Sequence, residues 1–219
     1  QRAEDALADM SARLRATLEA TADGILLVDR AGTIVNMNHR FSLLWTIPEA
    51  LLLARDDASI FEFMASRMRD QAVYRQRVAE IHADDENETE DVLSLADGQV
   101  FERKSRPARQ GQLIIGRVFS FTDITERKAT ESRLKLAASV FTHAHEGIMI
   151  TDMTGRIVEV NNTFSRITGY SREEVLGQSA RILGSGRQNS DFYTAMWRDL
   201  MSRGHWHGEL WNRRKNGDL

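Results

Sequence analysis

The chain contains one stretch of sequence twice. Residues 23–41, DGILLVDRAGTIVNMNHRF, align without a gap with residues 146–164, EGIMITDMTGRIVEVNNTF. Eight of the nineteen positions are identical, including two glycines, an aspartate, an asparagine and the final phenylalanine of each copy. Agreement of this kind indicates a duplicated structural unit. The chain must therefore fold the same small motif twice.

Each copy begins with the pattern of a β-hairpin followed by a helix. Short β-favouring runs at residues 25–29 and 148–152 are followed by return strands at 33–37 and 156–160. The glycines between them, Gly32 and Gly155, can take the positive φ that tight hairpin turns need. Asn38 and Asn161 then stand where a helix would begin, and asparagine is a favoured N-cap.

The patterns further along differ between the copies. In copy two, Ser171 to Glu174 form a capping box, and a helix with one apolar face runs from Asn189 or Ser190 to Gly204. Copy one shows a looser apolar stripe in a longer helix, made of Ile60, Phe63, Met64, Met68 and Val73. Strands are predicted at 89–95, 100–108 and 112–123 in copy one, and at 206–215 in copy two.

Copy two therefore ends before the last two strands that copy one shows, and we expect it to be incomplete, with an open sheet edge. The predicted organisation is an N-terminal amphipathic helix at 1–17, a first domain at 18–125, a connecting signalling helix at 126–140 and an incomplete second domain at 141–219. The predicted fold class is α+β. The N-terminus, with no methionine and no signal peptide, is expected to be that of an excised piece.

These residues resemble the PAS family of sensory domains. The likeness lies in Asp23-Gly-Ile, Asp29, Gly32, Asn38 and Phe41, in their counterparts of copy two, in Thr168–Gly177, and in the tract Phe119–Lys128 with its Asp-Ile-Thr. The resemblance implies two PAS-like domains, each a five-stranded antiparallel sheet with short flanking helices around a small pocket. It implies sensing of a ligand, redox or light signal and a helix-borne output, but does not name the ligand.

Flavin, as FAD or FMN, is the most specific ligand that the resemblance implies. Residues 177–184 and 205–215 resemble segments of flavin-binding PAS domains, which gives Asn161, Ala180, Trp206 and Asn212 as candidate pocket residues in copy two. An indole can cover the flavin ring, and a carboxamide can bond to its edge. Ala180 stands where light-sensing relatives have a cysteine, so a thiol adduct is excluded. The alternative is that Trp206 and Trp211 are ordinary strand aromatics.

Composition narrows the other possibilities. The net charge of −3 gives no general attraction to nucleic acid, and no apolar run is long enough to span a membrane, so direct membrane contact is not expected. The absence of cysteine excludes disulfides and thiolate metal sites, and is compatible with a cytoplasmic protein. The histidines fall at predicted helix or strand ends, which disfavours heme. No catalytic motif or metal-ligand spacing is evident, so we expect no enzyme activity from this chain.

The flanking helices are the predicted output. Residues 3–20 and 126–141 each have an apolar stripe that would suit a homodimer or a helix packed on its own sheet. Asp123, Ile124 and Thr125 form the predicted signal junction, since Asp123 and Thr125 can both cap the following helix. The first interpretation is an input module upstream of a cyclic-di-GMP synthesis or hydrolysis domain, or of a histidine kinase. The second is a ligand-free dimerisation and interaction scaffold.

Overall fold

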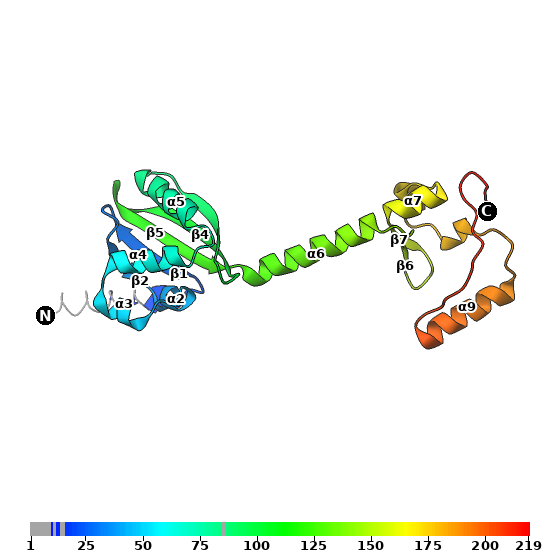
Figure 1. The fold of residues 1–219 in the computed structure, drawn as a ribbon, viewed down its shortest axis with the longest axis horizontal. Helices are drawn as coiled ribbons and strands as arrows, with labels where there is room; N and C mark the ends of the chain where they lie inside the picture. Colours follow the sequence, from blue (N-terminus) through cyan, green and yellow to red (C-terminus); the bar gives the residue numbers. More distant parts are fainter. Residues whose placement is uncertain (1–9, 11, 14–15, 85) are drawn as a thin grey trace. The chain divides into compact units, whose positions relative to one another are not determined.

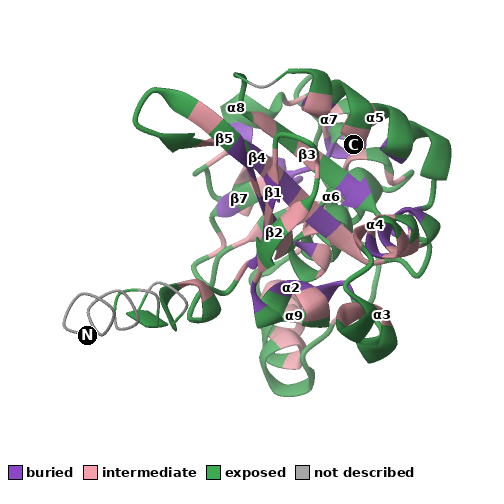
Figure 2. Cartoon of the chain, turned by 90° about the vertical axis from the view of Figure 1, so that its left-hand side faces the viewer, coloured by how far each residue is buried: buried purple, intermediate pink, exposed green. Residues whose placement is uncertain are grey.

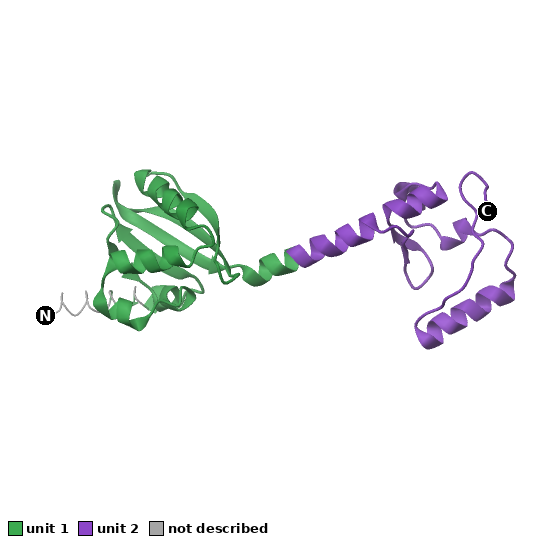
Figure 3. Ribbon diagram, in the orientation of Figure 1, with its two compact units in different colours: residues 1–131 green, residues 132–219 purple. Residues whose placement is uncertain are grey.

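The computed structural model describes residues 10, 12–13, 16–84 and 86–219. The chain divides into two compact units, residues 1–131 and residues 132–219 (Figure 3). Each unit is treated by itself below. The predicted helix at 1–17 lies largely outside the described residues; residues 16–19 are helical.

Unit 1 is an α+β domain built on a single antiparallel sheet (Figure 1). The sheet has five strands in the order β2-β1-β5-β4-β3, which confirms the predicted fold class. Its elements are β1 (Gly24–Asp29), β2 (Ile34–Met37), α2 (His39–Leu44), α3 (Glu49–Ala54), α4 (Asp57–Ser66), α5 (Gln71–Ala83), β3 (Thr89–Ser94), β4 (Val100–Gln110) and β5 (Leu113–Asp123).

The hairpin of the repeat is held by its conserved aspartate. The carboxylate of Asp29 accepts hydrogen bonds from the main-chain N–H groups of Ala31, at 2.8 Å, and Thr33, at 2.9 Å. Gly32 takes a φ of 84° inside this turn, a conformation that costs glycine nothing. Asp152 and Gly155 repeat the arrangement in the second copy. The aspartate and glycine that the two copies share are therefore explained by the requirements of the hairpin turn.

The asparagine of the repeat joins three parts of the chain. Asn38 caps α2 through its Oδ1, which accepts from the N–H of Phe41 at 2.9 Å and also from that of Ile25 at 2.8 Å. Its Nδ2 donates to the carbonyls of Leu18 and Asp23, both at 3.0 Å. Because Asn38 is buried, removing its amide would take away the side-chain acceptor of the Ile25 N–H and the bonds that hold Leu18 and Asp23 to the start of α2.

The glycine and phenylalanine of the repeat are in close contact. A Cβ added at Gly24 would lie 2.9 Å from the Cα of Phe41, so only glycine allows β1 to approach α2 so closely. In the second copy the same contact, between Gly147 and Phe164, is looser, at 3.2 Å. Both phenylalanines are buried. The identical residues of the repeat therefore form one packed corner in each unit.

The core of unit 1 lies between the sheet and its helices. Figure 2 shows buried residues along the central strands β1, β4 and β5. The predicted long helix of copy one is wrong, because the segment forms two helices, α4 and α5. Asp70 caps the second of them by accepting from the N–H of Val73 at 3.0 Å, and Met68 between them pairs with Leu95. The N-cap at Asp70 therefore divides the predicted apolar stripe between two helices.

Unit 2 contains fewer strands. After α6 (Thr125–His143), which begins in unit 1, it has a two-stranded antiparallel sheet of β6 and β7. Its remaining elements are β6 (Met149–Thr151), β7 (Ile157–Val160), α7 (Asn162–Thr168), α8 (Arg172–Val175), the 3-10 helix η1 (Ala180–Leu183) and α9 (Ser190–Arg203). The capping box of Ser171 and Glu174 is present, Asn189 caps α9, and Gly204 ends it with a φ of 76°.

The predicted strand at 206–215 is wrong. In this segment Asn212 forms only an isolated bridge with Gly184, and the Asn216-Gly217 turn is present without flanking strands. The reason is that this segment has no neighbouring strand to pair with. In unit 1 the corresponding strand, β3, gains its ladder by pairing with β4, and the described residues of unit 2 supply no equivalent of β4.

Candidate functional site

The interior of unit 1 is filled by aromatic side chains. Trp45 is fully buried and makes edge-on contacts with Phe101, at 5.4 Å between ring centroids, and with Phe121, at 5.3 Å. Phe41 packs on Phe121 at 5.5 Å. The indole Nε1 of Trp45 is buried and has no hydrogen-bond partner within the described part of the chain. The interior thus presents a packed aromatic cluster with one unsatisfied donor.

Beside the aromatic cluster, the same face of the sheet holds a buried ion pair. The guanidinium of Arg103 on β4 donates to Asp91 on β3 at 2.8 Å and lies over the ring of Tyr74 on α5, 5.6 Å from its centroid. Arg77 donates to the other carboxylate oxygen of Asp91 at 2.7 Å. Arg103 is 1% exposed. A charge this deeply buried is tolerated only because its partner is fixed beside it.

The titration of this cluster follows from its packing. Burial alone would raise the pKa of Asp91, but hydrogen bonds from Arg103 and Arg77 outweigh it and hold the pKa of Asp91 below its ordinary value. Burial raises the pKa of Tyr74. At neutral pH the cluster is therefore an ionised carboxylate between two guanidinium groups, next to a neutral phenol.

A second buried arginine, Arg117 on β5, joins the sheet to the loop after α5. Its Nε donates to the hydroxyl of Ser105 at 2.9 Å, one terminal nitrogen donates to the carbonyl of Asn87 at 2.6 Å, and the other to the carbonyl of Asp84. Sequence analysis did not single out Arg103 or Arg117. The signal that could have found them is spacing. Arg103 stands two positions from Phe101, and Arg117 two positions from Phe119, so each arginine shares the inward face of its strand with a phenylalanine.

The predicted signal junction lies where β5 passes into α6 with only Ile124 between them. The N–H of Ile124 donates to the carbonyl of Val100 at 2.9 Å, and the N–H of Val100 donates to the hydroxyl of Thr125 at 3.0 Å. We call this pair of hydrogen bonds the Val100 clasp. The carboxylate of Asp123 accepts from the N–H of Thr125 at 2.9 Å and from its hydroxyl.

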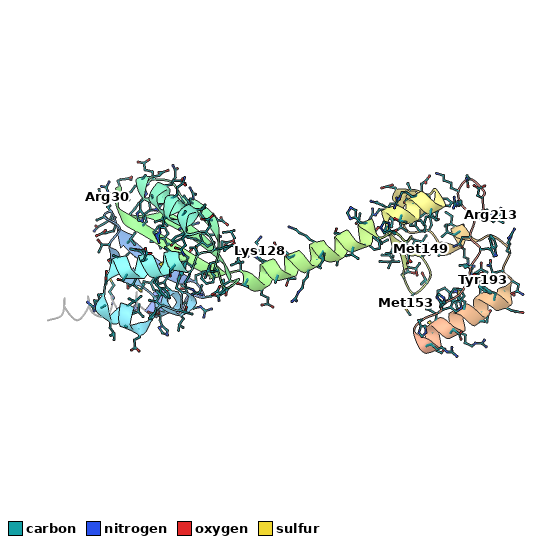
Figure 4. All side chains as sticks on the ribbon, viewed as in Figure 1. Arg30, Lys128, Met149, Met153, Tyr193 and Arg213 are labelled. Carbon is teal, nitrogen blue, oxygen red and sulfur yellow. The ribbon has the colours of Figure 1, made fainter. Side chains whose placement is uncertain are left out.

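The first turn of α6 is also held to the sheet. Ile124 is buried, and its carbonyl accepts from the N–H of Lys128, labelled in Figure 4, at 2.9 Å. Arg127 donates to Glu102 on β4 at 2.9 Å. The direction in which the helix leaves the sheet is therefore set by main-chain bonds, one buried side chain and one ion pair.

Of the four predicted flavin residues, Asn161 is committed to the framework. Its Oδ1 accepts from the N–H groups of Ile148, at 2.9 Å, and Phe164, at 2.8 Å, and its Nδ2 donates to the carbonyl of Glu146 at 2.9 Å. These are the bonds that Asn38 makes in unit 1. The Oδ1 of this buried amide could accept from a ligand only by giving up these bonds, so the contacts of Asn161 support a role in the framework.

The other three candidates lie on separate segments of unit 2. Ala180 begins η1 and packs, half-buried, against a small core around Val175. Trp206 is half-buried and meets Phe192 edge-on at 5.8 Å, and Asn212 is exposed at its bridge with Gly184. A cavity of about 300 Å³ in unit 2 is lined by other residues, namely Arg166, Ile167, Thr168, Gly169, Arg214, Lys215 and Asn216.

Among the described residues, no group of three or more histidine, aspartate or glutamate side chains is placed to hold a metal ion. No helix in that part of the chain is long and apolar enough to cross a membrane.

A five-stranded antiparallel sheet with short helices over one face, leading directly into a long helix, defines a class of small α+β signalling domain. The sequence profile of the PAS fold matches residues 18–132, more than half of the chain, and that of the PAS domain matches residues 145–219. The chain belongs to the PAS family, with two domains in tandem.

The relatives are regulators. The nitrogen fixation regulatory protein of Klebsiella oxytoca is 34% identical over 90 residues, which are 41% of this chain and 18% of that protein. The aerotaxis receptor of Escherichia coli is 34% identical over 68 residues, 31% of this chain and 13% of the receptor. Sporulation kinase E of Bacillus subtilis is 26% identical over 167 residues, 74% of this chain and 22% of the kinase.

This chain therefore spans less than a quarter of the length of these relatives. Among solved structures, a PAS domain from Colwellia psychrerythraea aligns with a TM-score of 0.41 and 15% identity, over 54% of this chain and 99% of that one. The comparisons thus place PAS domains of this kind in signalling proteins.

Proposed function

We propose that the chain is a sensory input module of a multidomain bacterial signal-transduction protein in the cytoplasm, and that unit 1 passes its conformational state into α6 through the Val100 clasp. The clasp itself is the observation that supports this most. Because Ile124 alone separates β5 from α6, and because Ile124 and Thr125 are both bonded to Val100 at the start of β4, a shift between β4 and β5 would move the helix.

The effector that we propose lies outside this chain, and the chain itself is non-catalytic. A cyclic-di-GMP synthesis or hydrolysis domain is proposed from the tracts Asp123–Lys128 and Trp211–Gly217, which resemble those ahead of such domains. A histidine kinase is the alternative, and the similarity to sporulation kinase E, which covers most of this chain, supports it.

We also propose that the parent protein is a homodimer through its flanking helices. None of the residues of α6, all of which the structure describes, is buried, and Leu134, Leu136 and Val140 are more than 60% exposed. Leu134 shares one helix face with Ala138 and Phe141, at spacings of four and three, and pairing with a second copy along that face would remove its apolar surface from water. Sedimentation of the chain with and without Leu134→Glu tests this: the variant should be a monomer where the natural chain is a dimer.

Flavin remains the proposed cofactor of unit 2, with Ala180, Trp206 and Asn212 as the residues available to it. A bound flavin would supply redox or light sensitivity. The competing proposal is a ligand-free scaffold, and the aromatic filling of unit 1 favours it for that unit. Visible absorbance of the purified protein separates the two: flavin bands support the cofactor, and a spectrum of protein absorbance alone supports the scaffold.

The parent protein tests the relay itself. Asp123→Ala removes the carboxylate that holds Thr125, while the sheet and core remain, so regulated output should no longer respond to the stimulus. Glu126→Ala, at an exposed position three residues further on in the first turn of α6, should leave the response intact. An Asp123→Ala protein with unaltered regulation would rule out the junction as the relay.

A further inference from the structure

Arg67 ends α4 and holds two segments that are distant in the sequence. Its side chain is 15% exposed, and its guanidinium bonds to four acceptors. Two acceptors lie after α2 and two lie in the turn between β3 and β4. A guanidinium with its donors in a fixed fork can hold such a set, whereas the ammonium of lysine cannot reproduce it.

The first segment contains the central side chain of the core. One terminal nitrogen of Arg67 donates to the main-chain carbonyl of Trp45 at 2.6 Å and to the hydroxyl of Thr46 at 2.8 Å. Thr46 has a φ of 50°, a left-handed conformation that a β-branched residue adopts only when its surroundings impose it. The backbone that carries the Trp45 indole is therefore both strained and pinned by Arg67.

The second segment leads straight to the Val100 clasp. The other terminal nitrogen of Arg67 donates to Gln99 Oε1 at 2.9 Å and to the carboxylate of Asp97. The main-chain carbonyl of Arg67 also accepts from the N–H of Ala96 at 2.8 Å. Gln99 is followed by Val100, whose N–H and C=O hold Thr125 and Ile124.

We propose that Arg67 is a positioning residue that couples the packing of Trp45 to the Val100 clasp and so to the start of α6. A rearrangement of the aromatic cluster displaces the Trp45 carbonyl, Arg67 follows because its guanidinium is hydrogen-bonded to that carbonyl, and the Asp97–Val100 segment moves with it. This rests on the proposed relay through α6 and adds the route by which the interior reaches it. Two measurements test this coupling directly.

The first measurement is amide hydrogen exchange in the whole chain carrying Arg67→Met. Exchange at the Ile124 N–H should accelerate by about tenfold or more, and by a larger factor than at the β1 amides of Leu26 and Val28, which report general loss of stability. Arg75→Met is the matched control. Arg75 pairs with Glu62 at 2.7 Å on the surface and touches neither segment, so exchange at Ile124 should change less than about twofold.

The second measurement, the chemical shift of the Trp45 indole N–H, distinguishes coupling from a role of Arg67 in stability alone. Thr125→Val removes the acceptor of the Val100 N–H, and coupling predicts that the Trp45 indole N–H resonance shifts in response. In the Arg67→Met background, Thr125→Val should leave that resonance unmoved, because coupling between two sites is reciprocal and depends on the residue between them.

Two results would overturn the proposal. One is acceleration at Ile124 no greater than at Leu26 and Val28; the other is a Trp45 shift of equal size with and without Arg67. Neither result affects the outcome of the Asp123→Ala test of regulated output. The coupling through Arg67 can therefore be refuted while the proposed relay through α6 is retained.

Discussion

The main-chain carbonyl of Val100 accepts a hydrogen bond of 2.9 Å from the N–H of Ile124, the one residue between the last strand of unit 1 and α6. The first residue of β4 therefore holds the chain at the point where it leaves the sheet. A helix that is bonded to the sheet at its first turn cannot change its direction without changing the sheet, and the reverse is equally true.

The asparagine of the repeat gives the first prediction. Asn38→Ala removes the buried amide that bonds the N–H groups of Ile25 and Phe41 and two carbonyls, and with it the side-chain cap of α2. We expect a loss of about 3 kcal/mol in the free energy of unfolding of unit 1. Urea unfolding followed at the Trp45 indole resonance measures it. Asn36→Ala, an exposed position on β2, should cost less than about 0.5 kcal/mol, and equal losses would refute the framework role.

The close contact between β1 and α2 gives the second. A Cβ at Gly24 would meet the Cα of Phe41 at 2.9 Å, a backbone atom that cannot move aside. Gly24→Ala should therefore destabilise unit 1 by about 2 kcal/mol. Gly147→Ala, where the distance is 3.2 Å, should destabilise unit 2 by less. Thermal unfolding of each unit, followed by unit-specific amide resonances, compares them. The reverse order would contradict the packing argument.

The buried ion pair gives the third. Asp91→Asn leaves the guanidinium of Arg103 buried without a counter-charge, which should cost about 3–5 kcal/mol. Because the pKa of Asp91 is lowered on folding, its ionisation stabilises unit 1 above the unfolded pKa of about 4, and that stabilisation is lost as pH falls through the lower folded pKa. Urea unfolding at several pH values should show an acid slope in the natural chain and a shallower one in Asp91→Asn, where Asp97, Glu102 and other carboxyls with lowered pKa values still contribute. Glu90→Gln, an exposed neighbour, should keep the slope of the natural chain.

A surface pair in unit 2 gives the fourth. Both oxygens of Glu159 accept from the guanidinium of Arg172, at 2.6 and 2.7 Å, and this pairing lowers the pKa of Glu159 from 4.5 to about 2. The pair therefore supports unit 2 fully above about pH 4.5, and its contribution disappears as pH falls toward 2. The carboxylate resonance of Glu159 measures the pKa directly. In Arg172→Gln the pKa should return toward 4.5, and a titration unchanged by that substitution would refute the assignment.

Features that depend on residues close together in the sequence could be predicted from it. The turn at Gly32, the caps at Asn38 and Asn161 and the box at Ser171 depend on residues within a few positions, and each is present. The five-stranded sheet of unit 1 followed from the repeat and the family resemblance together. The contact of Asp123 with the N–H of Thr125 agrees with the predicted capping, the signalling role of the junction stays a prediction, and the partner Val100 was not predicted.

Features that depend on pairing between segments far apart in the sequence were not predicted. The segment 206–215 has the composition of a strand, but a strand exists only with a neighbour, and Asn212 finds only Gly184. Arg103 and Arg117 look like surface residues until β3, β4 and β5 are aligned and both prove to face inward. The bonds of Asn161 to Ile148 and Glu146 reach 13 and 15 positions back in the chain and were not predicted, and its place in a ligand pocket stays a prediction.

The central claim is that α6 transmits the state of unit 1, and insertion of residues into this helix in the parent protein tests it most directly. Extra residues after Lys135 rotate everything beyond them about the helix axis, and about seven residues restore the original phase of a paired helix. We predict that insertions of about three or four residues invert or abolish regulated output and that an insertion of seven restores it. Output that responds to the stimulus equally at every insertion length would show that α6 is a passive tether and would contradict the account.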